Sequence, residues 1–149
     1  MDLRELYQTT ILDHNKKPRN FRVPEDANHE GHGHNPLCGD DITVHVTLED
    51  GVVKDIGFQG TGCAISKASA SLMTERVKGH TVAELDTMFE DFHELVTSDP
   101  QQEPDLAGMG KLAVFAGVRE YPMRVKCATL AWHTVSAAVH GEPGVAKTE

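Results

Sequence analysis

The sequence is poor in cysteine, in aromatic side chains and in positive charge. Three cysteines among 149 residues cannot make a complete disulfide framework within one chain, so we expect a reducing compartment, the cytoplasm. The 14 lysines and arginines are outnumbered by 23 aspartates and glutamates, which leaves a net charge of −9. This balance argues against a nucleic-acid-binding protein, because phosphate recognition needs clustered cations.

Long apolar runs are also missing. No segment has the roughly 20 apolar residues that a membrane-spanning helix needs, so no membrane role is expected. The segment 1–15 is charged and lacks the apolar core of a secretory signal. With aromatic residues at only 5%, the core must rely on Leu, Val, Ile, Ala and Met. Because no linker or repeat interrupts the chain, we expect residues 1–149 to form one domain, with 142–149 as a mobile tail.

The first quarter of the chain predicts one helix followed by a long loop. Asp2 and Glu5 have the spacing of a capping box, and apolar residues then recur at helical intervals. A helix over 3–14 that ends before Pro18 follows from this pattern. The segment 16–36 is polar and rich in Pro, Gly and Asn, which is typical of an irregular connection.

A β-hairpin is predicted next. Apolar and polar residues alternate over 42–48, and apolar residues return over 52–58. Asp50-Gly51 between these two runs is a common hairpin turn. The expected sheet is therefore small and antiparallel, and the sequence does not locate a third strand.

Helical patterns occupy the rest of the chain. One helix follows Cys63 and stops at Gly79, and a second begins at the Thr81–Glu84 capping box. A third is expected over 106–118, and a last one runs from Pro122 to Gly141. Together these elements predict an α+β fold in which about five helices pack with a small antiparallel sheet.

The three cysteines have neighbours that favour the thiolate form. Cys63 precedes a helix, Cys127 lies near the start of the last helix after two cations, and Cys38 is followed by glycine and then Asp40. Helix N-termini and nearby cations lower a thiol pKa. Three thiolates and one carboxylate would complete a tetrahedral shell for Zn²⁺ or an iron–sulfur cluster. The other interpretation is that the cysteines are small buried apolar residues, since no Cys-x-x-Cys pair is present.

A histidine cluster lies in the predicted loop. His29, His32 and His34 could bind a metal through their imidazoles, but no acid or cysteine pattern within the loop completes a shell. We interpret the cluster as part of a surface loop with adventitious metal affinity.

Several motifs resemble those of the U-type iron–sulfur cluster assembly proteins, the IscU and SufU family, and the resemblance extends from about Leu6 to His140. The motifs are Ile11-Leu12-Asp13-His14, Pro18-Arg19-Asn20, Asn35-Pro36-Leu37-Cys38-Gly39-Asp40 and Gly60-Thr61-Gly62-Cys63-Ala64-Ile65-Ser66. The resemblance implies an IscU/SufU-like fold, and it implies that Cys38, Asp40, Cys63 and Cys127 are the metal ligands.

Two features are similar to the SufU branch of that family. Lys126 stands directly before Cys127, where IscU proteins carry histidine, and extra chain is present around 86–105. SufU proteins are zinc-dependent sulfur-transfer proteins, so this resemblance implies Zn²⁺ as the cofactor. The alternative is a scaffold that assembles a [2Fe–2S] cluster on the same residues.

The resemblance also implies a partner and a sulfurtransferase-like activity. A pyridoxal-phosphate-dependent cysteine desulfurase of the SufS type would carry a persulfide, and Cys38, released from the metal when the partner binds, would attack it. The sulfur would then pass to downstream cluster-assembly proteins. Arg124 is similar to a basic residue of this branch beside the site and is expected to steady anionic sulfur or contact the partner. A structural zinc domain that only binds other proteins remains a further alternative.

Overall fold

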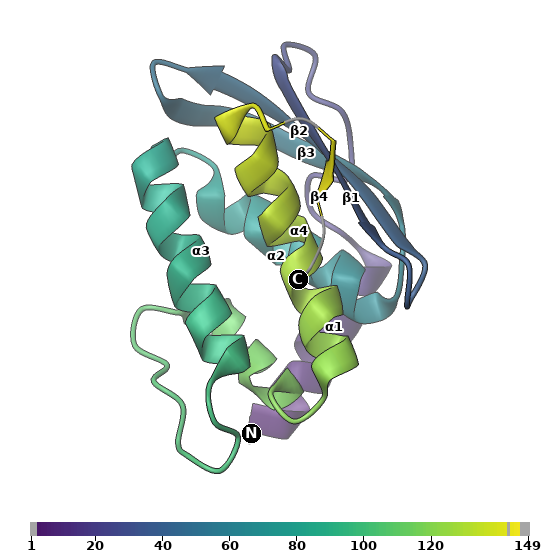
Figure 1. Cartoon of the computed structure of the whole chain (residues 1–149), viewed down its shortest axis with the longest axis vertical. Coiled ribbons are helices and arrows are strands. Elements are labelled where there is room, and N and C mark those ends of the chain that lie inside the picture. Colours follow the sequence, from purple (N-terminus) through teal and green to yellow (C-terminus); the bar gives the residue numbers. More distant parts are fainter. Residues whose placement is uncertain (1–2, 143, 147–149) are drawn as a thin grey trace.

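The structure, a computed structural model, describes residues 3–142 and 144–146. The described part of the chain contains four α-helices, one 3₁₀ helix and four strands. Figure 1 shows how they are arranged. In chain order the elements are α1 (Leu3–Lys16), β1 (His29–Asn35), β2 (Asp40–Glu49), β3 (Val52–Thr61), α2 (Ala64–Val77), α3 (Val82–Thr97), the 3₁₀ helix η1 (Gly110–Val118), α4 (Pro122–His140) and β4 (Val145–Ala146). The predicted α+β class is confirmed.

The sheet is mixed rather than purely antiparallel. Its strand order is β3-β2-β1-β4, with antiparallel pairs between β1 and β2 and between β2 and β3. Strand β4 pairs with β1 in the parallel sense, so the prediction of an antiparallel sheet was wrong in this detail. Strand β4 has only two residues, too few to produce a periodic pattern in the sequence. It lies inside the segment 142–149 that we expected to be a mobile tail. Residues 143 and 147–149 of that segment lie outside the described residues.

Strand β1 corrects the predicted loop over 16–36. Its buried positions are Gly31, Gly33 and Asn35, because the strand lies against α4. A Cβ atom at Gly33 would lie 2.0 Å from Thr134 Oγ1, so only glycine fits there. A strand whose buried face is made of glycine has no hydrophobic alternation, which is why its sequence resembles a loop.

The predicted hairpin turn, the Thr81 capping box and the helix end at Gly141 are confirmed. Asp50 and Gly51 both have positive φ, 53° and 75°, as a tight hairpin turn requires. Both hydrogen bonds of the Thr81 capping box are present, and α4 ends at Gly141 in the left-handed conformation. The helix predicted over 106–118 is instead a 3₁₀ helix that begins only at Gly110, which has a positive φ of 55°. Asp2 of the first predicted capping box lies outside the described residues.

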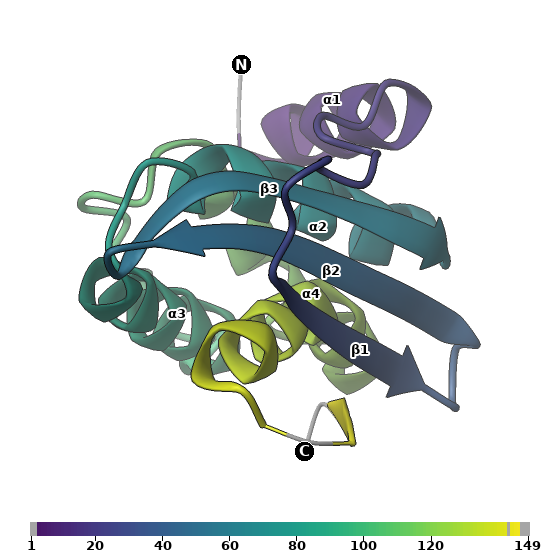
Figure 2. The ribbon, with the colours of Figure 1, turned by 90° about the horizontal axis from the view of Figure 1, so that it is seen from above.

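Helices α2 and α4 cover one face of the sheet, and α3 packs against α4 on the same side, as Figure 2 shows. Four aromatic side chains pack together in this layer, Phe89, Phe92, Phe115 and Trp132. Phe92 stacks on Trp132 with ring centroids 5.2 Å apart. The segment between α1 and β1 crosses the other face over β3. There Gly57 lies so close that a Cβ would be 2.0 Å from the carbonyl oxygen of Arg22. Within residues 3–142 and 144–146, no helix lies on the outer face of β1 and β2.

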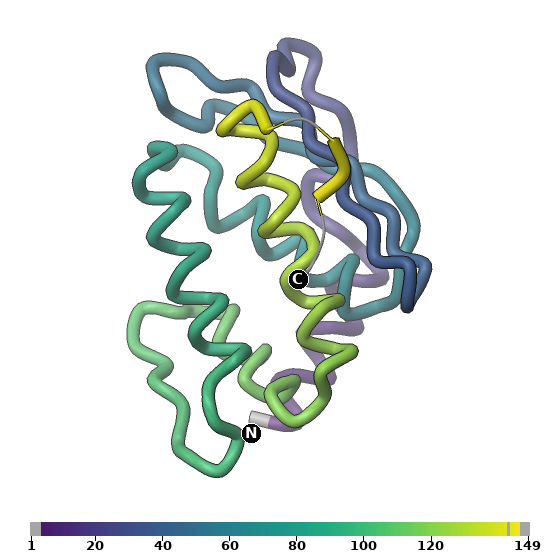
Figure 3. The backbone as a smooth tube through the Cα atoms, in the orientation of Figure 1, coloured from purple at the N-terminus to yellow at the C-terminus, as the bar shows by residue number. Residues whose placement is uncertain are grey.

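The first helix lies beside an element that is distant in the sequence. In Figure 3 the start of α1 lies beside η1. No helix among residues 3–142 and 144–146 is both apolar and long enough to cross a lipid bilayer.

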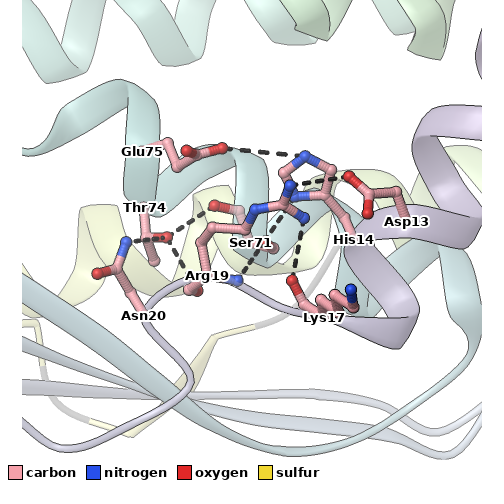
Figure 4. A network of polar contacts seen from close by, with 8 residues as sticks. All are labelled: Asp13, His14, Lys17, Arg19, Asn20, Ser71, Thr74 and Glu75. Atoms are coloured by element: carbon pink, nitrogen blue, oxygen red, sulfur yellow. Dashed lines mark hydrogen bonds and ion pairs between the residues drawn. The ribbon is translucent and has the colours of Figure 1, made fainter.

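A buried polar network joins the end of α1 to α2, as Figure 4 shows. The His14 side chain is 1% exposed, and its Nδ1 lies 2.7 Å from Ser71 Oγ. The same hydroxyl accepts a hydrogen bond from the backbone N–H of Arg19 at 2.8 Å. Asn20 Nδ2 donates to Thr74 Oγ1 at 3.0 Å. The Pro18-Arg19-Asn20 motif therefore has a structural role, because it fixes the chain that leaves α1 onto the helix beneath it.

His14 makes the stability of the fold sensitive to acid. Burial and the positive charge of Arg19 lower the pKa of His14, and the carboxylate of Glu75 opposes them only in part. The unfolded chain then binds more protons, so the free energy of unfolding falls as the pH drops below about 6.5, by at most about 1.4 kcal/mol per pH unit. We expect His14→Gln to remove this part of the pH dependence. Urea unfolding at pH 7.5 and 5.5 measures it, and an equal pH effect in both chains would contradict the prediction.

Candidate metal centre

The four predicted ligands come from three places in the fold. Cys38 lies in the turn between β1 and β2, and Asp40 is the first residue of β2. Cys63 is the N-cap of α2, and Cys127 lies in the second turn of α4. Because α2 and α4 both pack beneath the sheet, their N-terminal ends reach the β1–β2 turn.

Three of the predicted ligands meet in one cluster. A donor atom from each of Cys38, Asp40 and Cys127 lies within 4.8 Å of the others. The Sγ atoms of Cys38 and Cys127 are 3.3 Å apart although the residues are 89 positions apart in sequence. This spacing is far longer than a disulfide bond of about 2.05 Å and close to the roughly 3.8 Å that separates two thiolates on one tetrahedral zinc ion.

Asp40 gives the clearest sign that the cluster is built for a cation. Its side chain is fully buried, and Oδ1 accepts a hydrogen bond from the backbone N–H of Cys63 at 2.8 Å. The other oxygen, Oδ2, is buried and has no hydrogen-bond partner within the described ranges. An unpaired buried carboxylate oxygen is costly. A metal ion bound by the neighbouring sulfur atoms would satisfy it, so the donor set fits a thiophilic cation.

The surroundings of Cys63 and Cys127 shift the pKa values of the two thiols in opposite directions. The Cys127 thiol and the backbone N–H of Ser66, 3.4 Å from Sγ, lower the pKa of Cys63 to about 7. The hydrogen bond to Cys63 and burial raise the pKa of Cys127 above its ordinary value. Cys63 therefore borders the cluster as a ready thiolate, although its sulfur is not among the donor atoms that lie mutually within 4.8 Å.

The cysteines differ in their access to solvent. Cys127 is buried and Cys63 is intermediate, whereas Cys38 is exposed at the tip of its turn. Leu37 beside it is 60% exposed. Cys38 is therefore the sulfur that an incoming molecule reaches first.

Arg124 lies on the solvent side of the first turn of α4. Its guanidinium stacks over the Tyr121 ring, 4.4 Å from the centroid. The positive charge also lowers the pKa of Tyr7, although burial raises that pKa overall. Arg124 is thus exposed and one helical turn from Cys127.

Asn35 and Gly62 are two site residues to which the sequence assigned no role. Asn35 is 1% exposed, and its Nδ2 lies 3.9 Å from Cys127 Sγ, within the range of a weak hydrogen bond to sulfur. A Cβ at Gly62 would lie 2.8 Å from Asp40 Oδ1. Both residues stand inside the recognised motifs, so the motifs could have indicated them, but their contacts appear only in the folded chain.

Gly62 leads to a prediction about metal binding. The Cβ atom added by Gly62→Ala would push the Asp40 carboxylate out of place, because the surrounding site is closely packed. We expect the affinity for zinc to fall by about tenfold, while the metal-free chain stays folded. Competition with a chromogenic chelator measures the affinity. Gly117→Ala is a suitable control, since Gly117 has no left-handed φ and an added Cβ there makes only an ordinary contact, 3.7 Å from the Tyr7 ring. Equal affinities in the two variants would contradict the prediction.

Comparison with known proteins identifies the family. A family model described as NifU-like N terminal domain matches residues 6–140. The chain belongs to this family. The predicted resemblance to the U-type assembly proteins is therefore confirmed.

Members of both branches are similar to this NifU-like domain. The zinc-dependent sulfurtransferase SufU of Bacillus subtilis is 37% identical over 148 residues, which cover 99% of this chain and 95% of the relative. The iron–sulfur cluster assembly scaffold protein IscU of Thermotoga maritima is also 37% identical, over 93% of this chain and 96% of the relative. The crystal structure of a SufU protein from Fervidobacterium islandicum superposes with a TM-score of 0.80 at 32% identity, covering 91% of this chain and 98% of that one.

Proposed function

We propose that this protein is a zinc-dependent sulfur acceptor that takes persulfide sulfur from a cysteine desulfurase for iron–sulfur cluster biogenesis. The observation that supports it most directly is the exposed thiol of Cys38, 3.3 Å from the buried sulfur of Cys127. Asp40, with its unpaired buried oxygen, lies in the same cluster. The similarity to a zinc-dependent sulfurtransferase over nearly the whole chain supports the same function.

The ligands proposed for the ion are Cys38, Asp40, Cys63 and Cys127. Three sulfur donors and one oxygen favour Zn²⁺ over hard cations such as Mg²⁺. When bound, Zn²⁺ keeps its thiolate ligands deprotonated at neutral pH. Asp40, Cys63 and Cys127 are the anchoring residues, because all three are less exposed than Cys38.

Cys38 carries the chemical step. Its thiolate attacks the outer sulfur of a persulfide on the desulfurase, a new S–S bond forms on Cys38, and the S–S bond of the donor breaks. The donor cysteine leaves as a thiolate, and Cys38 holds the persulfide, so atoms, electrons and charge balance. Only an exposed sulfur can make this attack, which fits Cys38 and excludes the buried Cys127. Arg124, one turn away on the solvent side, offers a positive charge to an anionic sulfur or to the partner surface.

The second candidate is a scaffold that assembles a [2Fe–2S] cluster on the same donor residues. The similarity to the IscU scaffold of Thermotoga maritima favours it. The two candidates differ in what the protein holds after reconstitution with iron and sulfide. A stable cluster that can be passed to an apo-ferredoxin favours the scaffold, whereas tightly held zinc without cluster absorbance favours sulfur transfer.

Mass spectrometry of the zinc-loaded protein tests the proposal. The full chain is mixed with a pyridoxal-phosphate-dependent cysteine desulfurase of the SufS type and with cysteine. The expected result is a gain of one sulfur atom on the peptide that contains Cys38, together with faster turnover of the desulfurase. A desulfurase whose rate and persulfide level do not respond to this protein would contradict the proposal.

A further inference from the structure

The turn between β1 and β2 holds one exposed sulfur atom against a buried one. Cys38 Sγ lies 3.3 Å from Cys127 Sγ, and both cysteines are free thiols. A disulfide bond is about 2.05 Å long, so the two atoms need to approach each other by only about 1 Å to form one. A small movement of one side chain therefore brings them into bonding distance.

The Cys38 turn is the part of the site that can make this movement. Residues 36–39 are all exposed, and the backbone N–H of Cys38 donates a long hydrogen bond of 3.3 Å to the carbonyl of Asn35. Gly39 has a positive φ of 72°, and the space around it is open, since an added Cβ would meet nothing within 4 Å. Cys38 can thus approach Cys127 without displacing a strand or a helix.

Cys63 also lies beside Cys127, but its position is fixed. Its backbone N–H donates to Asp40 Oδ1 at 2.8 Å, and its sulfur accepts a hydrogen bond from the backbone N–H of Ser66 at 3.4 Å. Both bonds hold Cys63 at the N-terminus of α2, where it caps the helix. Cys38 is therefore the cysteine better able to close the gap to Cys127.

We propose that Cys38 and Cys127 form a reversible disulfide when the metal-free chain meets a peroxide. The Cys38 thiolate attacks one oxygen of hydrogen peroxide, the O–O bond breaks, and Cys38 becomes a sulfenic acid. The hydroxide that leaves takes up the proton lost from Cys38. The Cys127 sulfur then attacks the Cys38 sulfur, the S–O bond breaks, and the hydroxyl group leaves with the Cys127 proton as water. Two thiols and one peroxide thus give one disulfide and two water molecules.

The disulfide is a redox switch for the metal centre. It removes two of the ligands proposed for Zn²⁺ and the nucleophile proposed for sulfur acceptance. This consequence rests on the proposed function, whereas the bond itself depends only on the two sulfur atoms. Bound Zn²⁺ opposes the disulfide, because it occupies both sulfur atoms as thiolates.

The burial of Cys127 decides how the disulfide is reduced. Cys127 is 3% exposed and Cys38 is exposed, so an incoming thiolate attacks the Cys38 sulfur. Cys127 then leaves as a thiolate beside Asn35, whose Nδ2 lies 3.9 Å from its sulfur and donates a weak hydrogen bond to it. A small thiol therefore restores the reduced pair.

Alkylation after peroxide treatment tests this proposal. The metal-free full chain is treated with hydrogen peroxide, its remaining thiols are capped with N-ethylmaleimide, and the intact chain and its unreduced peptides are weighed by mass spectrometry. The reduced chain takes one label on each of its three free cysteines. We expect the oxidised chain to lose two hydrogen atoms, to take one label, and to give a peptide pair joined through Cys38 and Cys127. Treatment with dithiothreitol before capping is expected to restore all three labels.

Two variants make the result specific. Cys63→Ser is the matched control, and it is expected to form the same disulfide and then take no label. Cys38→Ser changes an exposed position and is expected to keep both of its remaining thiols under the same treatment. The proposal is overturned if the parent chain still takes three labels, or if the bond that forms involves Cys63 or joins two chains.

The assay also separates this proposal from the proposed function, because it contains no desulfurase and no persulfide. A chain that accepts sulfur on Cys38 but takes three labels after peroxide overturns the disulfide and leaves the proposed function intact. A chain that forms the disulfide but never accepts sulfur supports the disulfide and contradicts the proposed function.

Discussion

Replacement of Cys38 with serine is expected to abolish the gain of sulfur from a cysteine desulfurase. The serine hydroxyl is nearly isosteric with the thiol, but it supplies almost no anionic nucleophile at neutral pH. We expect the rate of sulfur acceptance to fall at least about a hundredfold. The position is exposed, so the fold should be kept. Mass spectrometry of the intact chain after reaction with desulfurase and cysteine measures the effect.

The internal control for this experiment is the position of the sulfur in the parent chain. Digestion without reductant should place the added sulfur on the peptide with Cys38 and not on those with Cys63 or Cys127. If Cys38→Ser still gains one sulfur atom at the parent rate, Cys38 is not the acceptor. A different outcome is that Cys38→Ser loses zinc and unfolds while the parent chain never forms a persulfide. The site is then a structural zinc site, as the binding-module alternative requires.

Removal of the Asp40 carboxylate is the change with the second large expected effect. Asp40→Ala deletes the one proposed oxygen ligand, and it also deprives the backbone N–H of Cys63 of its acceptor. We expect the affinity for zinc to fall at least about a hundredfold, since loss of even a supporting group typically costs ten- to a hundredfold. Competition with a chelator of known affinity measures this change.

Asp41→Asn is the matched control, because Asp41 is the next residue on the same strand with its side chain on the opposite face. It should leave zinc binding at the cysteines unchanged. Unchanged tight binding in Asp40→Ala would remove Asp40 from the ligand shell.

The elements that the sequence predicts well are those whose signals are local. The Asp50-Gly51 turn, the Thr81 capping box and the stop at Gly141 all occur as expected, because a few adjacent residues decide each of them. Strand β1 was missed because its inward positions are small, and the need for glycine there comes from Thr134 on a distant helix. The 3₁₀ form of η1 and the short strand β4 likewise follow from packing rather than from periodicity.

The sequence by itself determined the chemistry available to this protein. It supplies three cysteines in motifs that resemble a family of sulfur-handling proteins, an aspartate two residues after one of them, and a histidine pair with alternate spacing. Only the tertiary structure decided which of these groups meet. Helix α4 packs closely against the glycine face of β1, and the Cys127 and Cys38 sulfur atoms lie 3.3 Å apart. The register of β1 with β2 places Asp41 beside the histidines. These contacts join residues far apart in the sequence, and their geometry depends on how whole helices and strands pack. No local pattern of residues encodes that geometry.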